Sequence, residues 1–238
     1  MTVLLRFEES FARLADDFGD AALLPARLAT ACAEVLPIAG AGISLFMPDG
    51  FRVPVGASGE MAAHAERLQF TLGTGPCIEA HRTGRVVRIA LDGMIRRWPD
   101  YATALTAATP FRAILAAPLS VGLDALGTTD LFLDDPAQLD RLGADDVAVI
   151  TDVVSQRLSA SQSAGVGDAE PAWLASPAAE RRNVVFIALG MASVDLDVTA
   201  QVALALLRER ARRDGISVDD LALEVVGRRL RAADLREI

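Results

Sequence analysis

Lysine is absent from this 238-residue sequence: all 23 basic residues are arginines, set against 32 acidic residues. Without lysine, the chain cannot form a lysine Schiff base or supply the phosphate-binding lysine of a P-loop, so both classes of protein are excluded. Cysteine and histidine are scarce, with only Cys32, Cys77, His64 and His81. Two cysteines alone cannot build a disulfide framework or a four-ligand zinc site, so we expect no metal and no cofactor.

Long apolar runs are also missing, since no segment reaches the roughly 18 consecutive apolar residues of a membrane span. Arg6, Glu8 and Glu9 interrupt the N-terminal segment, which therefore does not resemble the apolar region of a signal peptide. With 52% hydrophobic and 23% charged residues, the composition is ordinary for a globular protein and excludes wholesale disorder. We therefore expect a cytoplasmic protein without a membrane segment.

Charge is unevenly distributed along the chain. Residues 1–172 hold 13 arginines and 22 acidic residues, whereas residues 173–238 hold 10 of each. The two parts meet at SQSAGVGDAEPA (161–172), a small-residue stretch typical of a flexible connection. We predict a first domain at 1–160, a linker at 161–172 and a second domain at 173–238.

The first domain shows both helical and strand patterns, which predicts an α+β fold. A Pro48-Asp49-Gly50 turn joins the first two expected strands, and the last expected helix has apolar residues at helical spacing. The expected helices are 2–18, 24–36, 59–69 and 143–160, and the expected strands are 41–47, 51–57, 86–90, 112–119 and 128–134.

The second domain predicts three helices that share a core. The first begins at Ser176-Pro177 and runs to about residue 193, with Val184, Ile187, Ala188 and Met191 inside. The second runs over 199–213 and stops before a glycine signal at Asp214-Gly215. The third begins at Ser217, with Asp220 completing a capping box; its expected inner face is Val218, Leu221, Ala222 and Val225.

Specific motifs in both parts resemble known families. The stretches FTLGTGPCIEAHRTGRVVRI (70–89), RRWPDY (96–101) and FRAILAAPLSVGLDALGTTDLFLDDP (111–136) resemble a GAF domain. Arg181, IALGMASVDLD (187–197) and ALALLRERARRDGISVDDLALEVVGRRL (203–230) resemble an ANTAR domain, the three-helix RNA-binding module of antiterminators. The resemblance implies an antiparallel GAF sheet flanked by helices, followed by a three-helix ANTAR bundle.

This resemblance implies that the GAF domain senses a signal while the ANTAR domain binds paired hairpins in nascent RNA and prevents a terminator from forming. Guanidinium groups suit phosphate oxygens and stack on bases, although runs of charge are more often solvated surface. The candidate RNA contacts are Arg181, Arg182, Ala188, Gly190, Arg208, Ala211, Arg212 and Arg229. Leu189 stands where many ANTAR domains carry a basic residue, which favours an alternative in which the bundle serves only dimerisation or protein interaction.

The GAF resemblance also implies a pocket for a small molecule, which we expect to be closed and largely apolar. Its expected lining residues are Leu45, Gly75, Cys77, Trp98, Leu115 and Leu131. Cys77 opens a helix, where it could act as a ligand contact or redox thiol, but an unpaired cysteine is more often a small buried residue. Likewise, Trp98 could close the pocket or simply pack on the sheet.

Catalysis is not expected. Some GAF folds reduce methionine sulfoxide through several cysteines, whereas this chain has only Cys77 near the expected pocket and no second cysteine or histidine placed to assist it. Because family members pair two hairpins with two ANTAR domains, we expect a homodimer. Its predicted contact uses apolar residues of 143–160 and of the first helix.

Overall fold

The computed structural model describes residues 1–47, 51–121, 124–163 and 171–236, so the predicted turn at 48–50 and most of the linker lie outside the described residues. The expected α+β order is present. The strands are β1 (Gly40–Phe46), β2 (Arg52–Ala57), β3 (Val87–Ala90), β4 (Ala113–Val121) and β5 (Asp124–Leu133). The first-domain helices are α1 (Val3–Arg13), α2 (Leu24–Val35), α3 (Glu60–Leu72), α4 (Pro76–Thr83), α5 (Leu91–Arg97), α6 (Pro99–Ala108) and α7 (Ala144–Ser163).

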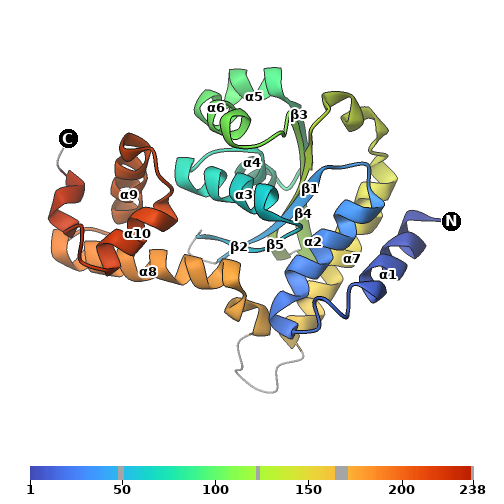
Figure 1. Ribbon diagram of the computed structural model, residues 1–238, viewed down its shortest axis with the longest axis horizontal. Coiled ribbons are helices and arrows are strands. Elements are labelled where there is room, and N and C mark those ends of the chain that lie inside the picture. Colours follow the sequence, from blue (N-terminus) through green and yellow to red (C-terminus); the bar gives the residue numbers. More distant parts are fainter. Residues whose placement is uncertain (48–50, 122–123, 164–170, 237–238) are drawn as a thin grey trace.

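The five strands form one antiparallel sheet in the order β2-β1-β5-β4-β3. Helices α1, α2 and α7 cover one face, and α3 to α6 cover the other, as Figure 1 shows. Successive strand residues point to opposite faces, so each strand contributes to two cores. Leu45, Leu115 and Leu131 join the α1–α2–α7 core, whereas Ile114, Ala116 and Phe132 join the other.

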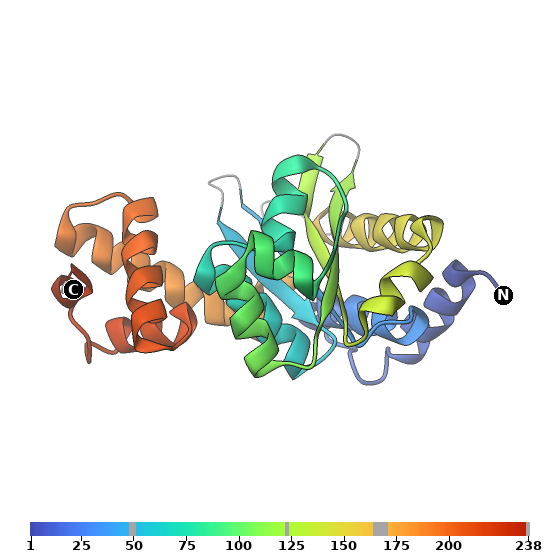
Figure 2. The ribbon, with the colours of Figure 1, turned by 90° about the horizontal axis from the view of Figure 1, so that it is seen from above.

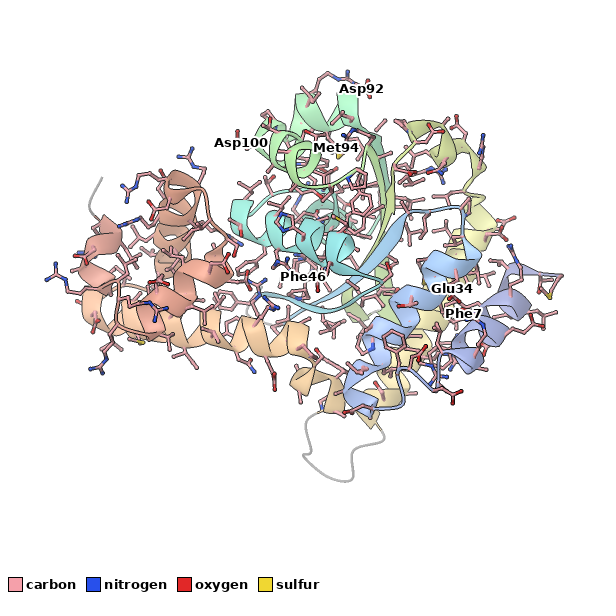
Figure 3. All side chains as sticks on the ribbon, viewed as in Figure 1. Phe7, Glu34, Phe46, Asp92, Met94 and Asp100 are labelled. Atoms are coloured by element: carbon pink, nitrogen blue, oxygen red, sulfur yellow. The ribbon has the colours of Figure 1, made fainter. Side chains whose placement is uncertain are left out.

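Helix α7 confirms its predicted apolar stripe. Val147, Ile150, Val154 and Leu158 are all buried and belong to the core under α1 and α2. Helix α1 similarly buries Val3, Phe7 and Phe11, and Figure 3 shows Phe7 on this side of the molecule. These residues pack inside the chain, so the predicted dimer contact would have to use the apolar residues of α1 and α7 that stay exposed, Leu4, Leu5 and Val149, and it remains a prediction.

The second part of the chain is the three-helix bundle of α8 (Pro177–Leu196), α9 (Ala200–Asp214) and α10 (Val218–Val226), hereafter the bundle. It lies at one end of an elongated molecule, beside α3 (Figure 2). Several predicted helix ends are confirmed. Ser176 and Ser217 cap α8 and α10, and Gly215 ends α9 with a left-handed φ of 68°.

Several predicted details differ from the structure. The first helix ends at Arg13 rather than near 18, and α5 and α6 replace a stretch for which no helix was expected. Of the four residues expected inside the first bundle helix, only Ala188 is fully buried, and Ile187 is 53% exposed. The buried row instead comprises Ala179, Arg182, Val185, Ala188, Leu189, Ala192 and Leu196, because α8 also packs on the first domain.

The two parts of the chain share their cores. Phe51 and Phe70 of the first domain belong to the apolar core of the bundle, and Phe51 meets Phe186 of α8 edge to face at 5.6 Å. Conversely, Trp173 and Ala179 pack into the core of the first domain. The bundle therefore rests on the first domain through an extended contact in this structure.

Candidate functional site

A cluster of buried polar side chains lies between the sheet and helices α3, α4 and α6. We call it the polar cluster: Ser44, Arg52, Glu66, Gln69, Cys77, Tyr101, Thr128 and Asp130, all nearly inaccessible to solvent. Ser44 and Thr128 face one another across β1 and β5, as do Gly42 and Asp130. The alternation of the strands thus gives this face of the sheet a charged centre inside an otherwise apolar core.

Arg52 and Glu66 form the central ion pair. Arg52 donates to the Glu66 carboxylate and, at 2.8 Å, to the Glu66 carbonyl oxygen, while the Ser44 hydroxyl donates to the same carboxylate at 2.6 Å. Gly42 leaves room for this carboxylate, because a Cβ at that position would lie 2.6 Å from Glu66 Oε1. These interactions satisfy most of a charge that would be very costly to bury alone.

Asp130 lies in surroundings that favour its protonated form. Burial raises the pKa of Asp130 well above its ordinary value, and the neighbouring Glu66 carboxylate raises it further. Gln69 Nε2 donates a hydrogen bond to Asp130 Oδ2 at 2.5 Å. The site therefore holds one guanidinium, ion-paired with Glu66, and a second carboxyl group, Asp130, whose surroundings favour the neutral form.

Five side-chain atoms of the polar cluster have no hydrogen-bond partner: Arg52 Nε, Glu66 Oε1, Thr128 Oγ1, Asp130 Oδ1 and the Tyr101 hydroxyl. Leaving a buried polar group unsatisfied costs about 1–3 kcal/mol. A small polar molecule that meets several of them would recover part of this cost. The site is therefore chemically suited to a ligand that carries both hydrogen-bond donors and acceptors.

Cys77 belongs to this cluster and Gly75 borders it, but burial disfavours a reactive thiol at this position. The Cys77 amide donates to Gln69 Oε1 at 2.9 Å. Gly75 has φ of 145°, and a Cβ there would lie 2.5 Å from Gln69 Oε1, so glycine is required on both grounds. Burial raises the pKa of the Cys77 thiol well above its ordinary value, which makes a reactive thiolate at this helix start unfavourable.

The other predicted pocket residues lie elsewhere. Leu45, Leu115 and Leu131 pack on the opposite face of the sheet from α3, so their prediction as neighbours of Cys77 is wrong. Trp98 packs against the core beneath α3 and α6, and the Arg97 guanidinium lies 4.6 Å from the centre of its ring. The surroundings of Cys77 are also far more polar than expected. The sequence analysis did not identify Arg52, Glu66, Gln69 and Asp130 as site residues. Their signal in the sequence is a charged or polar residue inside an otherwise apolar strand or helix pattern.

The bundle docks on α3 through two arginines that the sequence analysis assigned to RNA. The Arg182 guanidinium is completely buried, 3.3 Å from the centre of the Phe70 ring. Arg208 lies over the same ring at 5.1 Å and donates to the Phe70 carbonyl oxygen at 2.9 Å. The Val218 amide donates to Thr71 Oγ1 at 3.1 Å. These contacts define the junction between the first domain and the bundle.

The remaining predicted RNA residues do not form one surface. Ala188 and Ala211 are buried, and so is Leu189, which therefore fills the bundle core rather than a vacancy in an RNA surface. Arg181, Ala211 and Arg212 line a cleft against α3 and α6, and Figure 3 shows Asp100 of α6 beside it. Gly190 borders a separate hollow, with Arg228 and Arg231. Arg229 is exposed and paired with Glu224 at 2.8 Å, beyond the end of α10.

Two further tests concern metals and membranes. Among the described residues, no three histidine, cysteine, aspartate or glutamate side chains meet in a group that could hold a metal ion. In the same part of the chain, no single helix is long and apolar enough to cross a membrane. Helices α8 and α9 reach that length and composition only together, and they are bent by 107° to one another.

Comparison with known proteins identifies the first domain. Among solved structures, the chain is similar to free methionine-R-sulfoxide reductase from Neisseria meningitidis, with 19% identity over 67% of this chain and 92% of that chain, and a TM-score of 0.47. It is also similar to the GAF domain of a phosphoenolpyruvate-protein phosphotransferase from Coxiella burnetii, with 9% identity over 67% and 96% of the two chains and a TM-score of 0.48.

These structural likenesses are too distant to transfer an activity. Among curated proteins, no sequence matches this chain significantly. Residues 24–161 match the GAF domain family, and the match spans the sheet, helices α2 to α6, nearly all of α7 and the whole polar cluster. Because it covers more than half of the sequence, the chain belongs to the GAF domain family.

Proposed function

We propose that this chain is a sensory antiterminator, in which the GAF domain binds a small polar molecule and the bundle, an ANTAR domain at 173–238, binds paired hairpins in nascent RNA. One observation carries the connection between the two. Helix α3 holds Glu66 and Gln69 in the polar cluster and, directly after them, Phe70 and Thr71 in the junction. A ligand that moves α3 would therefore act on the bundle without a further intermediary.

RNA is the proposed partner because the bundle is rich in arginine and carries the ANTAR-like motifs. Arg181 and Arg212 are exposed in the cleft, while Arg182 and Arg208 are held at Phe70. The docked state withholds the second pair from phosphate groups. The signal is proposed to release the bundle from α3 so that all four guanidinium groups meet RNA. No catalytic step is part of this function.

A second candidate is an interaction module in which the bundle does not bind RNA. It is favoured by the burial of Arg182, Ala188, Leu189 and Ala211, which leaves few of the expected contacts at the surface. In this case, the junction would be a permanent structural contact.

Titration of a paired-hairpin RNA at several salt concentrations separates the two candidates. We expect the wild-type chain to bind, Phe70→Ala to bind more tightly, and an Arg181→Ala/Arg212→Ala variant to bind about tenfold more weakly with a flatter salt dependence. Arg96→Ala is the matched control, because Arg96 is exposed on α5, away from the bundle, and pairs with Asp92 on the same helix. If neither wild type nor Phe70→Ala binds any paired hairpin, the interaction module is the better description.

We also expect a homodimer, because a pair of hairpins needs two bundles. Its contact must differ from the buried stripe of α7. Light scattering of wild type with and without RNA measures the mass directly. A monomer under both conditions would contradict the dimer while leaving RNA binding by a single bundle testable by the titration above.

A further inference from the structure

A cavity of about 350 Å³ lies where α2, β2, α3 and the start of α8 meet, and we call it the junction cavity. Its walls are mainly apolar and come from both parts of the chain: Leu23, Ala26, Pro54, Val55, Ala63 and Pro177. Neither Cys77 nor Tyr101 borders it, and Glu66 is the residue that it shares with the polar cluster. An apolar chamber with a few polar groups is typical of a small-molecule site.

Charged side chains of both signs also line the junction cavity, among them Glu60 and Glu66 of α3, and one end of it opens between charged residues. Arg67 of α3, Arg181 of α8 and Asp219 of α10 line it, and the same three residues line the neighbouring cleft of about 650 Å³. They therefore stand where the cavity opens into the cleft. The Arg67 guanidinium lies 3.4 Å from His64 Nδ1, and among the described residues no acidic partner lies within ion-pair distance of Arg67 or Arg181. Two guanidinium groups from different parts of the chain are thus available to one anion.

Asp219 places a carboxylate beside the two guanidinium groups, and this carboxylate favours a hydrogen-bond donor on the ligand. Its side chain is 8% exposed, its Oδ1 lies 3.5 Å from Arg182, and its Oδ2 has no hydrogen-bond donor. A buried carboxylate oxygen without a donor is unfavourable, so a ligand that offers an N–H at this position gains free energy. This end of the cavity therefore suits a ligand that carries an anionic group next to a hydrogen-bond donor.

We propose that the junction cavity binds an α-amino acid with an apolar side chain. The carboxylate would lie between Arg67 and Arg181, the ammonium group would donate to Asp219 Oδ2, and the side chain would fill the apolar chamber. A simple anion would leave Asp219 unsatisfied, and a simple cation would face two arginines. Since both parts of the chain contribute residues, the bound amino acid would hold the bundle on the first domain.

Calorimetric titration of the full chain with L-leucine, L-isoleucine and L-phenylalanine tests this site. We expect saturable binding of at least one, and about tenfold weaker binding of 4-methylpentanoate, which lacks the ammonium group, and of isoamylamine, which lacks the carboxylate. Arg181→Ala should weaken binding about tenfold. Ala178→Leu, which adds bulk at the wall, should abolish it. Arg96→Ala is the control, and thermal unfolding confirms that each variant is folded.

Two results would overturn the proposal. One is the absence of binding by all three amino acids at millimolar concentration. The other is binding that survives Arg181→Ala and Ala178→Leu but is lost in Asp130→Asn, because the ligand would then occupy the polar cluster. The titration contains no RNA, so its failure leaves the antiterminator function untouched, and failure of RNA binding leaves the amino-acid site standing.

Discussion

Arg52 in the polar cluster and Arg182 at the junction are both almost completely buried, but the groups around them differ. Burial lowers the pKa of Arg52, yet the acidic groups of Cys77, Glu66 and Asp130 outweigh it and the pKa ends above its ordinary value. Burial lowers the pKa of Arg182 to about 9, opposed only by Asp219. None of the three guanidinium nitrogens of Arg182 makes a hydrogen bond, whereas Arg52 makes two to Glu66.

This difference indicates which contact is permanent and which can open. A buried charge is stable only when close partners replace the water that it loses. Arg52 has such partners and belongs inside the first domain in every state. Arg182 relies on the Phe70 ring and on the Asp219 carboxylate at 3.5 Å, without a hydrogen bond, so returning it to water costs less than it would for Arg52. The polar cluster is thus a fixed centre, and the junction is the separable part.

The largest expected effect is in the polar cluster. Glu66→Ala removes the partner of Arg52 and should lower the free energy of unfolding of the first domain by about 3–5 kcal/mol, because an unpaired buried charge remains. Urea unfolding followed by circular dichroism measures it. A loss below about 1 kcal/mol would mean that Arg52 finds another partner, and the contrast with Arg182 would disappear.

Phe70→Ala should act mainly on the junction. Removing the ring takes away the surface on which Arg182 and Arg208 rest. Truncation of a buried phenylalanine costs about 3–5 kcal/mol, and here we expect most of this loss to weaken the contact between the bundle and the first domain. Small-angle scattering should show a larger radius of gyration, and unfolding should separate into two transitions. A single transition with unchanged dimensions would show that the junction is as permanent as the polar cluster.

Asp130→Asn should change the pH dependence of stability. Because the pKa of Asp130 is raised in the folded protein, the folded state binds the proton more tightly than the unfolded state above pH ~4. Wild type therefore loses stability as pH rises from this value through the raised pKa, by about 1.4 kcal/mol for each pH unit in which Asp130 stays protonated. The variant lacks this loss. Urea midpoints of both proteins between acidic and neutral pH measure the difference, and parallel curves would contradict it.

Local signals of the sequence proved reliable where local interactions decide the structure. The caps at Ser176 and Ser217, the glycine at 215 and the stripe of α7 depend on neighbouring residues and were predicted. Helices α5 and α6 were missed because Pro99 interrupts them and their apolar residues lie at no clear spacing.

Positions that depend on tertiary contacts could not be predicted in this way. Leu45, Leu115 and Leu131 alternate correctly, but both faces of the sheet are covered, and alternation does not reveal which face lies under α3. Arg181 and Arg182 are neighbours in the chain, yet one is exposed and the other lies on Phe70. A charged residue in a core can be recognised only from the residue that it contacts. For Arg182 this residue is Phe70, about a hundred residues earlier in the sequence.

The smallest expected effect concerns the two cysteines, which should stay unreactive toward thiol reagents in the folded protein. Cys77 lies in the polar cluster and Cys32 lies on the other side of the sheet, where burial raises its pKa to about 12. Both thiols are protonated and inaccessible in the folded chain, so neither should react with a thiol reagent in mildly alkaline buffer until the protein unfolds. Phe70→Ala should leave Cys77 protected, because it opens only the junction, whereas Glu66→Ala should expose it. Mass spectrometry of the labelled peptides assigns each site, with Cys32 as the internal reference. Rapid labelling of Cys77 in wild type, with Cys32 still protected, would show that the polar cluster opens before the junction and would reverse the comparison.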